Sequence, residues 1–172
     1  SHFRKVILKK DGFKIESINQ APVFTGIPGD EEYGVEDPRI VKVNGNYLMT
    51  YVPISKKNGV STSLAISTDL AKWKRRGIIF SEQNKDCVLF SEKIDGKYVA
   101  LHRPETLFEF SKPGIWISYS PNLVYWGKEQ SIIKPRIYSW ESERVGSGAP
   151  PIKTDKGWLL LYHVVNLKKK NV

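Results

Sequence analysis

The sequence predicts an all-β fold assembled from β-propeller blades, and three observations support this prediction. A β-rich run, a turn and an apolar run recur around Gly45, Gly96 and Gly157. The continuation of this pattern also recurs, because residues 63–80 resemble residues 115–133. Self-similarity at a period of about 50 residues is typical of propeller blades or solenoids. Apolar residues at helical spacing do not extend beyond about two turns between capping residues, so no helix is expected.

The first complete unit is expected over residues 35–80 as four antiparallel strands. Its Asn44-Gly45 dipeptide favours a type I′ hairpin between the first two strands. A polar loop then leads to the third strand, and a Thr68-Asp69-Leu70 corner leads through Trp73 to the fourth. The four expected strands are 41–43, 47–51, 63–67 and 77–80. Four antiparallel strands in a unit of this length are typical of a propeller blade.

The second unit, 86–133, repeats this order, with Asp95-Gly96 as its hairpin and 115–120 as its third strand. Residues 146–172 are expected to begin the next blade, with a hairpin at Lys156-Gly157. Residues 1–34 are expected to supply outer strands of a preceding blade, around Asp11-Gly12, and a linker.

The length of 172 residues holds fewer blades than a closed ring. A propeller needs at least about four blades of roughly 40–50 residues each. We therefore expect 1–172 to form a single, incomplete β-propeller portion of a longer protein. The alternative is an open array of sheets that closes by homo-oligomerisation, since unpaired sheet edges favour aggregation.

Composition restricts the class of protein further. Residues of the apolar classes make up 40% of the chain and aromatic residues 12%, which suits a globular β core. No apolar run has the length of a membrane span or a signal peptide, so neither a membrane partner nor secretion is expected. The single cysteine, Cys87, lies in an apolar run and is expected to be buried. One cysteine forms no internal disulfide, which favours a cytoplasmic location.

The net charge of +9 is spread over turns and is not concentrated on one element. Nucleic-acid-binding proteins usually gather basic residues on one face and place stacking aromatics among them. We interpret these lysines as solvated surface and expect no nucleic-acid partner. No phosphate-binding loop, dinucleotide fingerprint, zinc spacing or nucleophile elbow occurs, so neither a cofactor nor a metal is expected.

Polar residues at the ends of the innermost strands are the natural site candidates in a propeller. Asp37 and Glu36 begin the first unit, and Pro38 holds Asp37 in an extended conformation. Because adjacent strand residues point to opposite faces, only one of the two carboxylates is expected to face the channel. Taken alone, this segment is better explained as a strand-start turn with a surface ion pair.

The matching positions of the next blades hold cations. Lys85 and Arg103 belong to the second unit, and His163 belongs to the third. A carboxyl group beside Lys, Arg and His suits protonation of a leaving group next to a bound anion. Considered alone, Lys85 could be a solvated lysine and His163 a hydrogen-bonded core histidine. Their occurrence at matching positions of the repeat favours a functional site. The neighbouring candidates for substrate binding are Glu36, Arg39, Asp86, His102 and Tyr162.

Four segments of the chain resemble the β-mannoside phosphorylases and related mannosidases of glycoside hydrolase family 130. They are GVEDPRI, NKDCVLFSEKIDGKYVALHRP, IWISYSPNLVYWG and GSGAPPIKTDKGWLLLYH. The resemblance runs from about Tyr33 to His163 and implies a five-bladed β-propeller. It also implies inverting phosphorolysis, in which inorganic phosphate attacks a β-mannoside to give α-mannose 1-phosphate and a shortened sugar.

By motif, Asp37 resembles the general acid of that family, and Lys85, Arg103 and His163 resemble its phosphate ligands. Phosphate serves as co-substrate, and no cofactor is implied. Since phosphate is the nucleophile, no second carboxylate is needed to activate water.

Three alternatives remain at this stage. An inverting β-mannosidase of the same family would be expected to lack the phosphate ligands. A non-catalytic sugar-binding propeller would stack sugars on Trp116, Trp126 or Trp140, although packing in the blade core explains most of these side chains. An interaction propeller would bind protein or nucleic acid through its basic surface.

Overall fold

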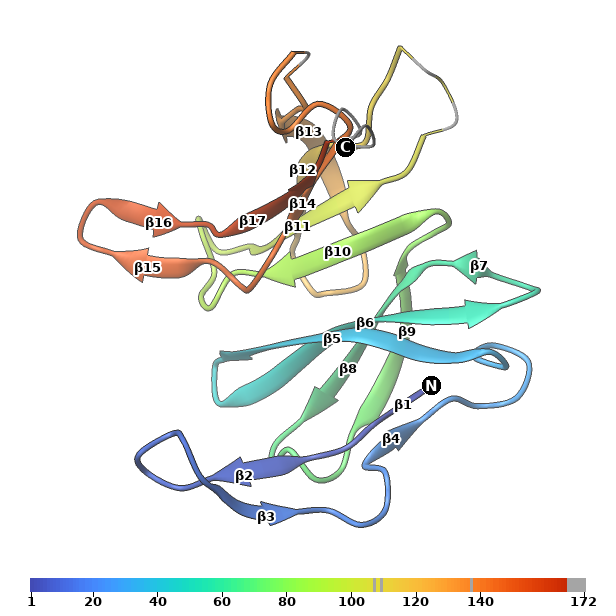
Figure 1. Ribbon diagram of the computed structural model, residues 1–172, viewed down its shortest axis with the longest axis vertical. Coiled ribbons are helices and arrows are strands. Elements are labelled where there is room, and N and C mark those ends of the chain that lie inside the picture. The colour runs from blue at the N-terminus through green and yellow to red at the C-terminus, as the bar shows by residue number, and fades with distance from the viewer. Residues whose placement is uncertain (107, 109, 137, 167–172) are drawn as a thin grey trace, which may run out of the picture.

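The computed structural model describes residues 1–106, 108, 110–136 and 138–166, and all its regular elements are β-strands. The all-β prediction is therefore confirmed. Two antiparallel sheets lie one above the other in the middle of the molecule, with the first strands below them and the last strands above (Figure 1).

The lower sheet has the order β5-β6-β8-β9, with a short strand, β7, paired to β6. Its strands are β5 (Gly34–Val43), β6 (Asn46–Ser55), β7 (Gly59–Val60), β8 (Thr62–Ser67) and β9 (Lys74–Phe80). The predicted strands lie within these bounds, and β5 and β6 are considerably longer than predicted.

The upper sheet has the order β10-β11-β12-β13. Its strands are β10 (Asn84–Leu89), β11 (Tyr98–Pro104), β12 (Ile115–Ser120) and β13 (Gly127–Ile133). Both sheets therefore have the four-stranded meander expected of a blade. The proposed division of the chain into a portion of one propeller, with blades at 35–80 and 86–133, stays a prediction.

The remaining strands form pairs at the two ends of the molecule. At the N-terminal end are β1 (His2–Phe3), β2 (Val6–Leu8), β3 (Ile15–Ile18) and β4 (Phe24–Thr25), which pair β1 with β4 and β2 with β3. At the other end are β14 (Arg144–Ser147), β15 (Ile152–Thr154), β16 (Gly157–Leu159) and β17 (Tyr162–Val165), which pair β14 with β17 and β15 with β16. Residues 167–172 of the predicted third unit lie outside the described residues.

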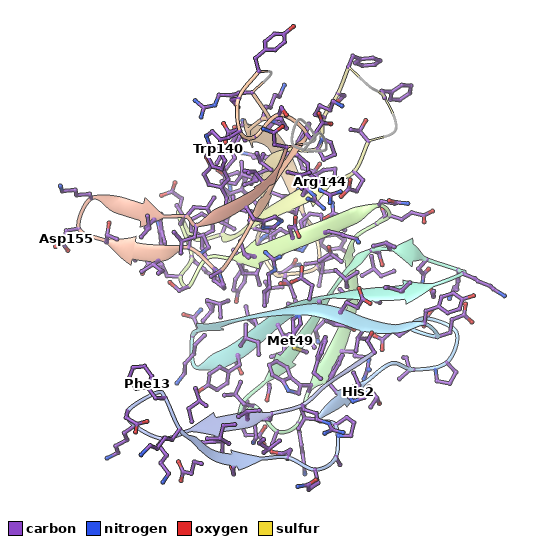
Figure 2. All side chains as sticks on the ribbon, viewed as in Figure 1. His2, Phe13, Met49, Trp140, Arg144 and Asp155 are labelled. Atoms are coloured by element: carbon purple, nitrogen blue, oxygen red, sulfur yellow. The ribbon has the colours of Figure 1, made fainter. Side chains whose placement is uncertain are left out.

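The hairpins explain why these sequences turn where they do. Asn44 and Gly45 have φ values of 48° and 82°, and Asp95 and Gly96 have 49° and 76°, as a type I′ turn requires. The third hairpin differs from the prediction: Thr154 pairs with Gly157, so the turn residues are Asp155 and Lys156. Gly157 follows the turn with a φ of 119°, a conformation that glycine adopts easily and that residues with a Cβ atom avoid. Figure 2 places Asp155 at the tip of this hairpin.

Three apolar clusters join the sheets in series. One joins the N-terminal strands to the lower sheet and includes Phe24 and Met49, the latter near the centre of Figure 2. A second joins the lower and upper sheets and includes Leu48, Cys87 and Leu89. The third joins the upper sheet to β14 through Val145. Cys87 is 4% exposed, which confirms its expected place in the core, and this burial raises the pKa of its thiol.

The first strands of successive sheets lie next to one another. β10 packs against β5 and β6 on one side and β14 on the other. The hydroxyl of Thr50 donates to the backbone oxygen of Cys87 at 2.6 Å, which ties β6 to β10. Over the described residues, no helix has the length and apolarity needed to cross a membrane.

Candidate active site

A cavity of about 290 Å³ opens where the first two strands of three successive sheets meet. Charged side chains line it from every side, and two valines, Val52 and Val165, complete its wall. The charged or titratable residues of the lining are Glu36, Asp37, Lys85, Asp86, Arg103, Arg144 and His163. All four catalytic or phosphate-binding candidates from the sequence are therefore brought together.

The repeat itself explains this convergence. Val52, Arg103 and His163 each lie seven residues beyond the second residue of their hairpin turn. Each also faces the start of the preceding strand in the same register, opposite Glu36, Lys85 and Gly146 respectively. Equivalent positions of neighbouring blades thus point to one place, as the sequence predicted for Arg103 and His163.

A β-bulge places Asp37 and Asp86 differently from the prediction. The strand register skips between Glu36 and Arg39, and again between Lys85 and Val88. Asp37 and Asp86 have φ values of 50° and 53°, in the left-handed region that aspartate tolerates better than most residues. A bulge interrupts the alternation of side chains, so Glu36 and Asp37 both line the cavity. The expectation that only one of them would do so was wrong.

Asp86 is the centre of the charged network. Its Oδ2 lies 2.9 Å from a guanidinium nitrogen of Arg103 and 3.1 Å from Nε2 of His163. Its Oδ1 accepts a hydrogen bond of 3.2 Å from Arg39. The side chain of Asp86 is only 9% exposed, so these three groups are its main compensation for lost water. Asp86 therefore fixes the positions of Arg103 and His163.

Gly146 allows this arrangement. A Cβ atom at this position would lie 2.0 Å from Oδ2 of Asp86 and 2.8 Å from Nε2 of His163. Such distances are well below van der Waals contact. The glycine is therefore required by the close approach of Asp86 and His163 to the β14 backbone.

Arg39 connects Asp37 to Asp86. Its Nε and one terminal nitrogen donate to Oδ1 and Oδ2 of Asp37, both at 2.9 Å, in a bidentate pair. Its other terminal nitrogen donates to the backbone oxygens of Ser147 and Gly148, the latter at 2.6 Å. Arg39 thus joins the first sheet to β14 and holds the carboxylate of Asp37 at the cavity.

Lys85 and Arg144 are the free cations of the cavity: neither has a carboxylate partner among the described residues. Glu36 is the lining carboxylate that lacks a cationic partner within the same ranges. Arg103, by contrast, also contacts Glu105 at 2.6 Å. Positive charge is consequently available to an incoming anion chiefly from Lys85 and Arg144.

Arg144 was missed by the sequence reasoning. It precedes Gly146 by two residues on β14, so it shares a strand face with the position opposite His163. That two-residue spacing from Gly146 was the available signal in the sequence. Figure 2 labels Arg144 in the upper part of the molecule, where β10, β11 and β14 lie.

His102 and Tyr162, two candidates for substrate binding, are not brought into this cavity. His102 is 1% exposed and stacks on Phe80, with ring centroids 4.0 Å apart. Tyr162 donates a hydrogen bond of 2.9 Å to Glu141, which raises the pKa of the phenol. Each is the strand neighbour of a cavity residue, Arg103 or His163, and regular alternation turns it to the opposite face. Over the described residues, no group of three or more His, Cys, Asp or Glu side chains has a metal-binding arrangement.

Comparison with known proteins gives matches over nearly the whole chain. Residues 8–172 match glycoside hydrolase family 130, described as beta-1,4-mannooligosaccharide phosphorylase. A 1,2-beta-oligomannan phosphorylase of Thermoanaerobacter sp. (strain X514) is 42% identical, over 92% of this chain and 52% of that protein. A beta-1,2-mannobiose phosphorylase of the same organism is 40% identical, over 92% of this chain and 51% of that protein.

A solved structure agrees. Beta-1,2-mannobiose phosphorylase from Listeria innocua, in complex with beta-1,2-mannobiose, superposes with a TM-score of 0.86 at 35% identity. The match covers 93% of this chain and 44% of that one. The predicted fold class, that of the five-bladed β-propellers, is confirmed. The chain spans about half the length of the relatives it matches.

Proposed function

Because the chain belongs to glycoside hydrolase family 130, we propose that the protein cleaves β-mannosides with inorganic phosphate. The products would be α-mannose 1-phosphate and a shortened sugar. One observation supports this proposal above the others: Lys85, Arg103, Arg144 and His163 line one cavity together with Asp37.

The proposed phosphate site combines groups suited to a tetrahedral dianion. Lys85 offers a point charge with three donors, and Arg103 adds a guanidinium whose terminal nitrogens already contact Asp86 and Glu105. Arg144 adds a second guanidinium at the opening of the cavity. Asp86 keeps Arg103 and His163 fixed before phosphate arrives, so little reorganisation accompanies binding.

Asp37 is the proposed general acid. Its side chain is 38% exposed, against 9% for Asp86, so Asp37 is the carboxyl group that a sugar can reach. Both Asp37 oxygens are held by Arg39, and we propose that a substrate hydroxyl replaces one of these contacts when Asp37 delivers its proton. Attack by phosphate on the opposite face of the mannose ring would invert the anomeric carbon without a carboxylate base.

The β-1,2 linkage is the proposed substrate linkage. The two relatives compared above and the Listeria innocua enzyme are named for β-1,2-mannosides. The family description names β-1,4-mannooligosaccharides instead. We favour β-1,2 because these matches cover nearly the whole chain at 35–42% identity.

Product analysis of the full-length protein tests this proposal. Incubated with β-1,2-mannobiose and phosphate, it is expected to release equal amounts of mannose and mannose 1-phosphate, and to release neither when phosphate is omitted. β-1,4-Mannobiose, as the matched substrate, is expected to react more slowly. Release of free mannose without phosphate would instead identify an inverting β-mannosidase and overturn the proposal.

A further inference from the structure

A second cavity, of about 530 Å³, lies beside the end of β9 and the outer strands of the upper sheet. It shares no lining residue with the cavity around Asp86. Its volume falls in the range of about 300–1,000 Å³ that small-molecule sites occupy. Its wall includes His102, whose imidazole plays no part in the proposed reaction.

The hydrogen-bonding neighbours of His102 determine which ring nitrogen carries the proton. The hydroxyl of Thr62 lies 3.2 Å from the backbone oxygen and 3.3 Å from Oδ1 of Asn84 and is shared between these acceptors, which places Oδ1 toward Thr62 and the amide nitrogen toward the ring. That nitrogen lies 2.8 Å from Nδ1 of His102, and an amide nitrogen can only donate. Burial lowers the pKa of His102 to about 4, so the ring is neutral at pH 7. The single ring proton is therefore on Nε2.

This Nε2–H donor is buried and has no hydrogen-bond acceptor among the described residues. Oε1 of Glu129 lies 3.8 Å away, beyond hydrogen-bonding distance. A ligand hydroxyl placed beside the two atoms, within hydrogen-bonding distance of each, would accept from Nε2 and donate to Glu129, because one hydroxyl does both. The buried indole nitrogen of Trp126, on the same cavity wall, likewise lacks an acceptor within the described ranges.

The rest of the wall suits a hydroxyl-rich, uncharged ligand. Glu82, Glu105 and Glu129 supply acceptors, and among the described residues no Lys or Arg belongs to the lining. Glu105 contacts Arg103, which is outside the lining, whereas Glu82 and Glu129 have no Lys or Arg partner within the described ranges and so repel phosphate and other anions. Tyr125 is 74% exposed at this cavity and, with Trp126, offers aromatic surface for an apolar ring face.

We propose that this cavity is a second carbohydrate site, which binds a neutral sugar unit through His102, Glu129 and the Tyr125–Trp126 pair. The site is separate from the cavity that contains Asp37. The proposal does not depend on phosphorolysis, since it concerns binding alone.

Calorimetric titration of the full-length protein with β-1,2-mannotetraose, without phosphate, tests the proposal. Wild-type protein is expected to bind at two sites. Glu129→Gln is expected to weaken one of them about tenfold, because the acceptor of the hydrogen bond loses its charge. Tyr125→Ala is expected to weaken the same site and to leave the rate of the mannobiose reaction unchanged. Both side chains are at least 43% exposed, so both variants should fold.

Glu16→Gln is the matched control, because Glu16 is an exposed glutamate on β3 and does not line this cavity. It is expected to titrate as wild type does. The proposal is overturned if Glu129→Gln and Tyr125→Ala titrate like Glu16→Gln. It is also overturned if inorganic phosphate competes for the second site. None of these results depends on whether the protein is a phosphorylase.

Discussion

Asp86 and Lys85 are neighbours in the chain with opposite predicted roles. Asp86 is buried and contacts Arg39, Arg103 and His163, whereas Lys85 has no carboxylate partner among the described residues. Removing one partner from a buried charge network typically costs about 3–5 kcal/mol, since the remaining charges lose their compensation. Asp86→Asn is therefore expected to reduce the free energy of unfolding by about 3 kcal/mol, measured by urea denaturation.

Lys85→Gln is the matched variant. It is expected to change the free energy of unfolding by less than about 0.5 kcal/mol, as substitutions outside such networks do. Its effect should fall instead on the KM for phosphate. Equal stability of the Asp86→Asn and wild-type proteins would contradict the central role given to Asp86.

His102 predicts a dependence of stability on pH. Burial lowers its pKa to about 4 from an ordinary value of 6.5. Between these values the unfolded chain binds a proton that the folded chain excludes, so stability falls as the pH drops through this window. The loss between pH 7 and pH 5 is expected to be about 2 kcal/mol, measured by urea denaturation at each pH. In His102→Gln this part of the pH dependence should disappear, and a variant that follows the wild-type slope would show that His102 is not its source.

Individual residues also show how far the sequence could predict the site. The repeat identified Lys85, Arg103 and His163, because equivalent blade positions converge in any propeller. It did not reveal that a bulge turns both Glu36 and Asp37 to the cavity, since aspartate tolerates φ values near 50° but is far more often found in ordinary strand or turn conformations. His102 was wrongly expected in the same cavity as Arg103. The side chains of β11 alternate regularly there, so His102 points to the opposite face of the sheet from Arg103.

At the level of elements, the hairpin turns carry a prediction about glycine. Gly96 has φ 76° and no atoms near its missing Cβ, so only its backbone conformation opposes a side chain. Gly96→Ala is expected to destabilise the protein by about 1 kcal/mol, because alanine disfavours positive φ. Gly127→Ala, at the start of β13, has equal space and no positive φ, and should be neutral or slightly stabilising. Thermal unfolding of the two variants measures the difference, and equal melting temperatures would contradict this account.

The elements themselves were largely predictable because hairpin chemistry is local. Asn44-Gly45 and Asp95-Gly96 turn as predicted, since both residues of each pair accept positive φ. The third turn moved by one residue, to Asp155-Lys156, because a type I′ turn at Lys156-Gly157 would force lysine into a positive φ; neither Asp155 nor Lys156 has one. The shift is visible only in the register of the paired strands. Counted from the shifted turn, His163 occupies the same position in its hairpin as Arg103 does in the preceding one.

For the whole molecule, the decisive property is that the proposed phosphate ligands come from different sheets. Lys85 and Arg103 belong to the upper sheet, and Arg144 and His163 belong to β14 and β17. A bound anion would bridge these sheets across the cavity. A bound anion would therefore oppose the separation of these sheets during unfolding.

Phosphate is accordingly expected to stabilise the folded full-length protein in the absence of sugar. A ligand at 100 times its dissociation constant stabilises by about 2.7 kcal/mol if it binds the folded state alone. Thermal unfolding with increasing phosphate should show a rising Tm, whereas potassium chloride of equal ionic strength should not reproduce it. The double variant Lys85→Gln/Arg144→Gln keeps the Asp86 network but removes the two unpaired cations, so it should lose most of this shift. If the double variant were stabilised by phosphate as strongly as wild type, the anion would bind elsewhere, and the cavity would not be the phosphate site.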